Sequence, residues 1–134
     1  PGAQDKAGIA LFADGVPRMP RGSSPSTHIL KPNLRRLPKV WHSAANEAIV
    51  MRTARLCGLP TADVFYEPLT QSCVVTRFDR VSLGDGTSGR LACEDGAQVL
   101  GIWPANKYEC SAEDLATALA DLCPARPLAA MMCA

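Results

Sequence analysis

The sequence predicts an α+β fold: a small antiparallel sheet with one principal helix, followed by short helices. Three observations lead to this class. Strand-like apolar runs at residues 8–13 and 28–31 come first, a capped helical segment at residues 44–57 follows, and two more strand-like runs occupy residues 62–67 and 72–78. Because the apolar period changes from strand to helix and back, the two kinds of element are expected to pack on each other.

The first two strands are separated by a long connection. The run at residues 8–13 ends at Asp14-Gly15, which is a turn signal, and residues 17–25 are rich in proline, glycine and serine. We therefore expect a strand, a surface loop and then a second strand at residues 28–31.

The segment 44–57 is the clearest helix. Ser43 is the expected N-cap, because its hydroxyl can accept a hydrogen bond from an unpaired amide of the first turn. Gly58 suits a left-handed C-terminal residue, and Pro60 prevents the helix from continuing. The expected apolar face comprises Ala48, Met51, Ala54 and Arg55, widened by Ile49, Val50 and Leu56.

The next two strand-like runs surround a turn. Residues 73–75 are continuously apolar, as expected for a central strand. The glycine-rich segment 84–89 is predicted to close another hairpin with residues 90–92.

Short helices are predicted to follow. One covers residues 94–100, and another begins at Ser111, with Asp114 completing a capping-box pattern, and runs to Leu122. Residues 124–134 contain two prolines and give no clear pattern.

Composition excludes several classes of protein. The chain has 134 residues and a net charge of +1, from 14 basic and 13 acidic side chains, so it has no general attraction to nucleic acid or membranes. The basic cluster Arg35, Arg36 and Lys39 is better explained as a solvated loop than as a phosphate or RNA patch. No apolar run is long enough to span a membrane, and no secretory signal is recognised, so we expect a cytoplasmic protein whose chain starts within a longer one.

The cysteines do not show the spacing of a metal site. The sequence contains no C-x-x-C pair, which zinc sites commonly use. Without a secretory signal, buried free thiols are expected rather than disulfides. The six residues are Cys57, Cys73, Cys93, Cys110, Cys123 and Cys133.

Two segments could contact phosphate. The first is a small-residue turn before the first strand, which lets backbone amides approach an anion and adds a lysine. It comprises Gly2, Ala3, Gln4, Asp5 and Lys6. The second is Lys31, which Pro32 biases toward an extended backbone, so that its ammonium can point at phosphate oxygens. For either segment alone, an ordinary turn or a surface lysine is the simpler explanation.

Two further segments complete a pattern. Asn46-Glu47 lies in the first turns of the helix, where a negative charge is favourable in any case. Arg77-Phe78-Asp79-Arg80 ends the apolar strand at residues 72–78.

Together these motifs resemble the HipA-like serine/threonine protein kinases, the toxins of bacterial toxin–antitoxin pairs. The matching segments, in order, are G-A-Q-D-K from Gly2, T-H-I-L-K-P from Thr27, N-E at Asn46 with M-x-x-A-x-x-x-G-L from Met51, and R-F-D-R from Arg77, followed by weaker matches to about Glu109. The resemblance implies an incomplete protein-kinase fold: an upper, nucleotide-binding lobe at residues 1–109, then a helix and tail at residues 110–134.

The resemblance also implies roles for single residues. Lys31 would bind the α- and β-phosphates of ATP and pair with Glu47, as kinases do. His28 would lie beside the nucleotide, more as a packing or hydrogen-bonding residue than as a base. Thr76, Arg77, Phe78 and Asp79 would form the segment that contacts adenine, where Thr76 replaces the glutamate usual in the family.

The expected function is therefore that of a partial HipA-like kinase. The intact parent would use ATP and Mg²⁺ to phosphorylate a protein, of the aminoacyl-tRNA synthetase type, and would bind a HipB-like antitoxin. The family's catalytic loop and metal-binding aspartate have no counterpart here, so no catalytic or metal-binding residue is expected and the chain alone should be inactive. Two alternatives stay open: a non-catalytic module that binds ATP or antitoxin, and a gene remnant without a stable fold.

Overall fold

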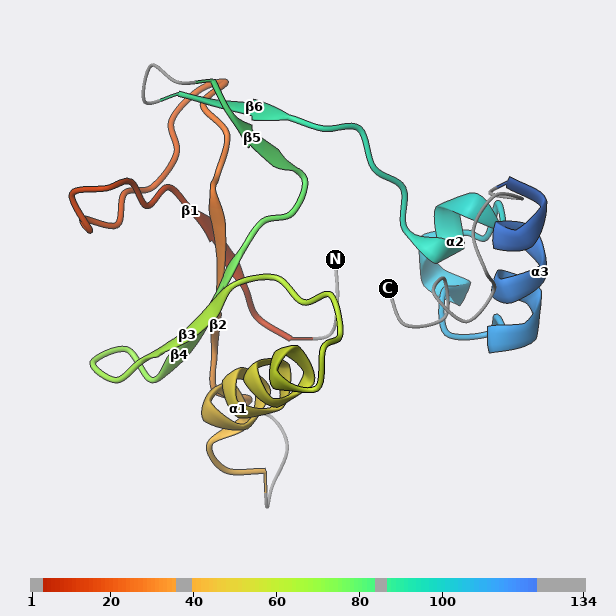
Figure 1. Ribbon diagram of the computed structural model, residues 1–134, viewed down its shortest axis with the longest axis horizontal. Coiled ribbons are helices and arrows are strands. Elements are labelled where there is room, and N and C mark those ends of the chain that lie inside the picture. The colour runs from red at the N-terminus through yellow and green to blue at the C-terminus, as the bar shows by residue number, and fades with distance from the viewer. Residues whose placement is uncertain (1–3, 36–39, 84–86, 123–134) are drawn as a thin grey trace. The chain divides into compact units, whose positions relative to one another are not determined.

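The computed structural model describes residues 4–35, 40–83 and 87–122. The chain forms two compact units, residues 1–91 and residues 92–134 (Figure 1). The first unit contains the sheet and the long helix, and the second contains the short helices, so the expected α+β class is confirmed. The division after Glu109 that the motifs suggest stays a prediction.

The central sheet has four antiparallel strands in the order β1-β2-β4-β3. The strands are β1 (Ala7–Ile9), β2 (His28–Pro32), β3 (Val64–Glu67) and β4 (Ser72–Thr76). In the register of β2 with β4, Lys31 lies opposite Cys73 and His28 lies opposite Thr76. Since β4 has a neighbour on each side, it is a central strand, as its apolar run predicted.

The first strand is shorter than expected. It ends at Ile9 instead of residue 13, because the chain beyond it takes other partners. Ala10 forms an isolated bridge with Arg18, and the amide of Leu11 donates a 2.8 Å hydrogen bond to the hydroxyl of Thr27. The long connection is thereby folded back along the start of β2.

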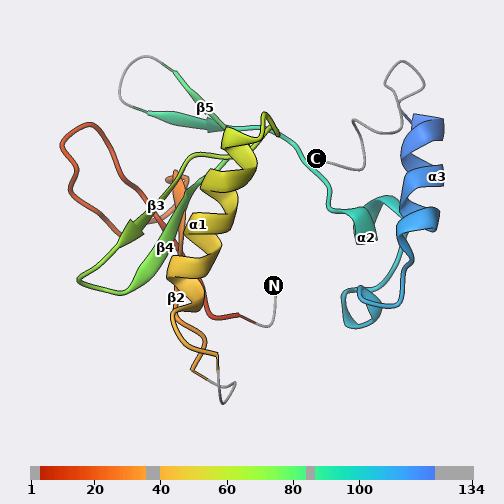
Figure 2. The ribbon, with the colours of Figure 1, turned by 60° about the horizontal axis from the view of Figure 1, so that its bottom comes forward.

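The helix α1 (Ser43–Leu56) packs along one face of the sheet (Figure 2). Its contact is made by two small residues: Ala44 is fully buried and Ala48 is 3% exposed. They pack on Cys73 of the central strand, surrounded by Val64, Tyr66 and Val75. Small side chains at this contact bring the helix close to the sheet.

The predicted N-cap is wrong. The capping position is His42, in the left-handed region with φ 55°, and its side chain makes no capping hydrogen bond. Ser43 is the first helical residue, and its hydroxyl accepts a 2.8 Å hydrogen bond from the amide of Leu34. The first-turn amide of Ala44 donates to the side-chain oxygen of Asn33 at 3.0 Å. A residue from the preceding connection therefore replaces the local cap.

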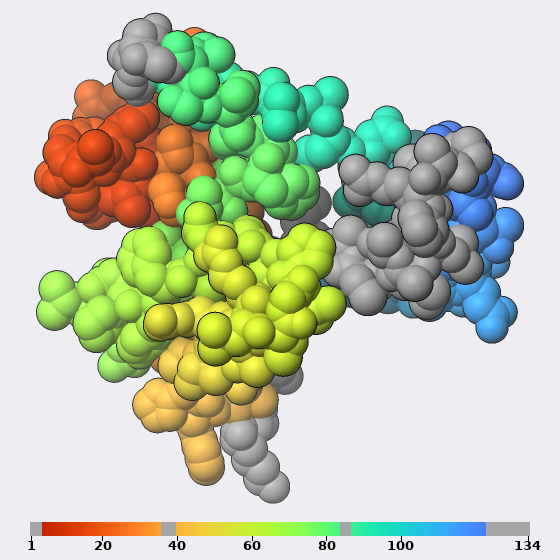
Figure 3. Space-filling view, in the orientation of Figure 1, coloured from red at the N-terminus to blue at the C-terminus, as the bar shows by residue number. Residues whose placement is uncertain are grey.

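The predicted apolar face of α1 is partly wrong. Ile49, Val50 and Leu56 are 64%, 56% and 88% exposed, so they lie on the outer side of the helix. Figure 3 shows atoms of α1, in yellow, on the surface of the molecule. The inner part of the predicted face is confirmed, since Ala48 is buried and Met51 and Ala54 are half-buried, whereas Arg55 is exposed. A wider apolar stripe has nothing to contact in this unit.

A hairpin completes the first unit. Its strands are β5 (Arg80–Ser82) and β6 (Ser88–Arg90), so the predicted hairpin is confirmed, with its second strand two residues earlier than expected. The guanidinium of Arg90 donates a 3.3 Å hydrogen bond to the carbonyl oxygen of Ser23. The hairpin is thus tied to the connection between β1 and β2.

The second unit consists of α2 (Gly96–Val99), the 3₁₀ turn η1 (Pro104–Asn106) and α3 (Ala112–Leu122). The capping box of α3 is confirmed: the amide of Asp114 donates to the Ser111 hydroxyl at 3.0 Å, and the amide of Ser111 donates to the Asp114 carboxylate at 3.2 Å. The tail at residues 124–134 lies outside the described residues. No helix in the described part of the chain is long and apolar enough to cross a membrane.

The described cysteines are free thiols, as expected. Their burial is not uniform, because Cys73 is buried, Cys110 is half-buried, and Cys57 and Cys93 are exposed. The expectation of burial is therefore wrong for the two exposed residues. Cys123 and Cys133, and Arg36 and Lys39 of the basic cluster, lie outside the described residues.

Candidate functional site

The centre of the candidate site is an ion pair between Lys31 of β2 and Glu47 of α1. The ammonium nitrogen of Lys31 donates a hydrogen bond to one carboxylate oxygen of Glu47. The two side chains are 24% and 26% exposed, so each is shielded on most sides but open to a ligand on one. The structure brings these two residues together although they lie 16 positions apart in the sequence.

Three features hold this pair in place. Lys31 projects from the interior of the sheet, opposite buried Cys73. Glu47 lies between Ala44 and Ala48, the two small residues that bring α1 against the same face of the sheet. The bond from Ala44 to Asn33 joins the start of the helix to the end of β2. A lysine anchored by strand and helix loses little rotamer entropy when it binds an anion.

The turn before β1 approaches the same end of β2. The side-chain amide of Gln4 donates a 3.2 Å hydrogen bond to the carbonyl oxygen of Pro32, the residue after Lys31. Asp5 and Lys6 are exposed, and Gly2 and Ala3 lie outside the described residues. The structure therefore places Gln4 of the G-A-Q-D-K segment at the end of β2, one residue beyond Lys31.

The ion pair affects the thiol beneath it. Burial raises the pKa of the Cys73 thiol to about 11, and the nearby Glu47 carboxylate raises it further while Lys31 lowers it. The thiol is thus neutral at physiological pH and serves as an apolar floor for the pair. The sequence indicated only that Cys73 belongs to an apolar strand, so its place beneath the site was missed.

His28 is not beside Lys31. Side chains alternate along a strand, so residues 28 and 31 project to opposite faces of the sheet. The hydroxyl of Thr27 lies 2.8 Å from Nδ1 of His28, and burial lowers the pKa of the imidazole. His28 is therefore a neutral hydrogen-bonding residue at pH 7. Its expected place beside a nucleotide stays a prediction.

The other end of β4 carries a charge cluster around Asp79. Arg77 binds both carboxylate oxygens of Asp79, at 2.8 and 2.5 Å, and Arg80 binds one at 2.8 Å. Asp79 is 7% exposed, and these guanidinium groups, Arg77 above all, hold the pKa of its carboxyl well below the usual range. Its charge is thereby neutralised within the fold.

Two backbone amides next to this cluster already donate hydrogen bonds within the fold. The amide of Thr76 donates to the carbonyl oxygen of Asp63 at 2.8 Å, and the amide of Arg77 donates to that of Thr27 at 2.9 Å. The ring of Phe78, in contrast, is 79% exposed. A cavity of about 450 Å³ adjoins Thr76, Arg77 and His28. A planar ligand here would have to use the Phe78 ring and backbone groups other than these two amides.

Lys31 and Thr76 lie three residues apart in register, roughly 10 Å along the strand direction. Among the described residues, no three acidic, histidine or cysteine side chains are grouped so as to hold a metal ion. Since the arginines already neutralise Asp79, the described residues do not fit a Mg²⁺ site of the protein's own. They do present one oriented cation, Lys31, which fits a phosphate oxygen.

A family of known proteins and a curated relative match this chain. The family described as HipA-like C-terminal domain matches residues 1–132. A Sinorhizobium fredii (strain NBRC 101917 / NGR234) protein named "Putative kinase Y4mE" is 40% identical over 111 residues, which are 80% of this chain and 25% of that protein.

A solved structure is also similar. It is that of the Shewanella oneidensis MR-1 toxin–antitoxin system HipA, HipB and its operator DNA complex, with a TM-score of 0.71 and 25% identity over 98% of this chain and 33% of that one. The chain thus spans a quarter of the length of the curated relative and a third of that of the solved one.

Proposed function

The chain belongs to the HipA-like C-terminal domain family, and we propose that it is the ATP-binding lobe of a HipA-like serine/threonine protein kinase. The observation that carries this proposal is the ion pair of Lys31 with Glu47, which joins strand and helix. Kinases use such a pair to place a lysine on the α- and β-phosphates of ATP.

The chemistry that the pair supplies is electrostatic. Glu47 fixes the position of the Lys31 ammonium while leaving two of its three N–H donors for phosphate oxygens. Because the pair is partly shielded from water, its attraction for phosphate is stronger than that of a freely exposed lysine. Gln4, bound at Pro32, would bring the backbone of the G-A-Q-D-K segment to the same phosphates.

The adenine ring would lie near the other end of β4. The exposed ring of Phe78, beyond the end of β4, can pack on the base. The end of β4 lies roughly 10 Å along the strand direction from Lys31, which suits a ligand with an aromatic group at one end and phosphates at the other. The Thr76 side chain projects to the face opposite Lys31, so the base would contact Phe78 and the backbone at the strand end instead of that side chain. Arg77, Asp79 and Arg80 would keep the shape of this segment instead of contacting ATP, since they bind one another.

Phosphoryl transfer would require residues that this segment does not supply. ATP would bring Mg²⁺ with its phosphates, whereas the described residues offer no cluster that could hold this ion, and Glu47, the carboxylate beside Lys31, is engaged in the ion pair. The intact parent would phosphorylate a serine or threonine of a protein, of the aminoacyl-tRNA synthetase type. The 134-residue chain alone should bind ATP without transferring phosphate.

We also propose a HipB-like antitoxin as partner of the intact parent, in the cytoplasm. Support comes from the Shewanella oneidensis structure, which contains HipA with HipB and operator DNA. The near-neutral charge of this chain favours protein and nucleotide partners over direct binding of nucleic acid.

Calorimetric titration with ATP and Mg²⁺ tests the proposal. Saturable binding is expected for the wild type, loss of detectable binding for Lys31→Ala, and about tenfold weaker binding for Glu47→Gln, which leaves the lysine unanchored. Lys107→Ala is the matched control, since Lys107 belongs to the second unit and stacks on Tyr108. Circular dichroism should show that all four proteins are folded.

One observation favours a second function. Thr76 stands where the family usually has glutamate, which would weaken adenine recognition. If a folded wild type does not bind ATP, the chain is better described as a non-catalytic module that binds the antitoxin. Antitoxin binding that does not depend on ATP would then be expected.

A further inference from the structure

We propose that a second hollow in the first unit is a binding site for a small apolar anion, such as an aromatic carboxylate. The hollow lies between the β1–β2 connection and the strand β6, and its volume is about 710 Å³. Cavities of this size are typical of small-molecule sites. The proposal does not depend on ATP binding, because none of its lining residues belongs to the lysine–glutamate pair.

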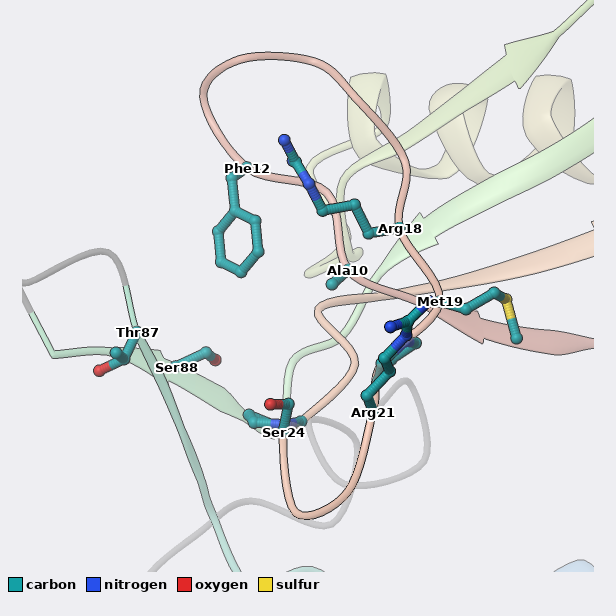
Figure 4. A pocket seen from close by; sticks show the side chains of 10 residues that line it. Ala10, Phe12, Arg18, Met19, Arg21, Ser24, Thr87 and Ser88 are labelled. Carbon is teal, nitrogen blue, oxygen red and sulfur yellow. The ribbon is translucent and has the colours of Figure 1, made fainter.

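The lining suits a ligand with an apolar body. Figure 4 shows Phe12, Ala10, Ser24, Thr87 and Ser88 around the hollow, together with the two arginines Arg18 and Arg21. Met19, Pro20 and Pro25 complete the lining. Apolar walls with a few polar groups are the usual composition of a site that binds and orients an organic molecule.

The walls are held in place before any ligand binds. Arg80 donates a 2.7 Å hydrogen bond to the carbonyl oxygen of Ser26, and Arg90 donates one of 3.3 Å to that of Ser23. On the other side, the amide and carbonyl of Ala10 exchange hydrogen bonds of 2.8 and 2.9 Å with those of Arg18. A ligand would therefore lose less free energy to loop ordering than on an unanchored loop.

The two arginines of the lining differ in charge balance. Arg18 binds both carboxylate oxygens of Asp14, at 3.0 and 2.7 Å, so its charge is neutralised. The backbone carbonyl of Arg21 accepts a 3.1 Å hydrogen bond from the amide of Ser24, whereas its guanidinium has no hydrogen-bond or ion-pair partner within the described part of the chain. An unpaired guanidinium beside an apolar surface favours a ligand that carries one carboxylate, sulfonate or phosphate. This single cation determines the ligand class.

The hollow adjoins another cavity of the first unit. The cavity beside Thr76 and Arg77 shares Phe12, Thr87 and Ser88 with it. Arg77 also lies 3.4 Å from the Ser26 hydroxyl, at the end of the anchored wall. A bound anion would therefore contact side chains that also line the neighbouring cavity.

The test uses 2-naphthoate and its neutral counterpart 2-naphthalenemethanol, titrated into the ¹⁵N-labelled full chain and followed by NMR. Saturable 2-naphthoate shifts are expected at Ala10, Phe12, Ser24 and Ser88, with about tenfold weaker binding of the alcohol. Arg21→Gln should weaken 2-naphthoate binding about tenfold and leave alcohol binding unchanged, because only the anion uses the guanidinium.

Arg52→Gln is the matched control, because Arg52 is an exposed arginine of α1 that lines a different hollow. It should leave both titrations unchanged. The proposal is overturned if the shifts do not saturate, if they centre on α1, or if Arg21→Gln and Arg52→Gln weaken binding equally, since each result indicates adsorption to exposed apolar surface instead of a site.

Discussion

The side-chain oxygen of Asn33 accepts a 3.0 Å hydrogen bond from the amide of Ala44, and this bond connects the end of β2 to the first turn of α1. Two residues before Asn33 is Lys31, and three residues after Ala44 is Glu47, the two members of the ion pair. The bond therefore fixes the starting points of both elements that form the candidate site. It also satisfies a helix amide that the residue at the capping position leaves unpaired.

Replacing Asn33 by alanine should lower the free energy of unfolding by about 1 kcal/mol, because the amide of Ala44 loses its acceptor. The measurement is urea denaturation followed by circular dichroism. Asn46→Ala is the control: Asn46 is exposed within α1, and alanine is the better helix former, so its stability should not fall. Equal losses for both variants would contradict a capping role for Asn33.

The cluster around Asp79 should matter more for stability than any exposed ion pair. Asp79→Asn leaves Arg77 and Arg80 without their buried counter-charge, so we expect a loss of about 2–4 kcal/mol, measured by urea denaturation at pH 7. The matched control is Asp14→Asn, whose carboxylate binds Arg18 in an exposed pair, and little change is expected there.

The same cluster predicts a pH dependence. The pKa of Asp79 is lower in the folded state than its ordinary value of 3.8, so the unfolded chain takes up this proton first as the pH falls. The contribution of Asp79 to the free energy of unfolding is present above pH 3.8 and is lost progressively as the pH falls below it. Between pH 5 and pH 2, stability should therefore fall more steeply for the wild type than for Asp79→Asn. If the free energy of unfolding fell with the same slope for the wild type and for Asp79→Asn, this prediction would be wrong.

Thiol labelling should separate the described cysteines. Cys73 is buried, and its pKa is raised from 9.0 to about 11, so at pH 8 its thiolate is scarce and inaccessible. Iodoacetamide should modify it roughly a hundredfold more slowly than exposed Cys57 and Cys93, as followed by peptide mass spectrometry. In denaturing urea the difference in labelling rate between Cys73 and the exposed cysteines should vanish. Rapid labelling of Cys73 in the native protein would show that α1 does not cover it.

Raising the pH should act on stability through the same thiol. A group whose pKa is raised on folding stabilises the native state below its ordinary value and loses this contribution as the pH passes through the raised one. For Cys73 the loss falls between pH 9 and about 11. Cys73→Ser gives the comparison, since its hydroxyl does not titrate in this range.

Much of the site could be predicted because its parts are local in sequence. The run at residues 28–31, the helix from residue 44 and the glutamate near its start follow from short-range patterns, and family resemblance assigned the pair to them. The pairing itself is not local: it depends on the register of β2 with β4 and on the close approach of α1. Periodicity predicts each strand and helix separately and says nothing of which side chains meet. The pairing of Lys31 with Glu47 was therefore expected only from the family resemblance, and the structure shows it directly.

The errors have a common cause. Ser43 has the right chemistry for an N-cap, but the first-turn amide of Ala44 donates instead to the side chain of Asn33, which lies outside the helix. Ile49 and Leu56 have the right hydrophobicity for a core face, but they lie on the outer side of α1, and the buried contact with the sheet is made by Ala44 and Ala48. In each case a tertiary contact overrode a local preference, and nothing in a single sequence marks which preference will be overridden.

The contrast between Ala48 and Ile49 gives the last prediction. Ala48 is 3% exposed against the sheet, and Ile49, the next residue, is 64% exposed on the outer side of α1. Ala48→Met should push the helix away from Cys73 and cost about 1–3 kcal/mol of stability, measured by urea denaturation. Ile49→Met should change stability by less than about 0.5 kcal/mol. Because Glu47 moves with the helix, Ala48→Met should also weaken ATP binding, whereas Ile49→Met should not. If both substitutions were neutral, the close packing of α1 could not be what positions Glu47 beside Lys31.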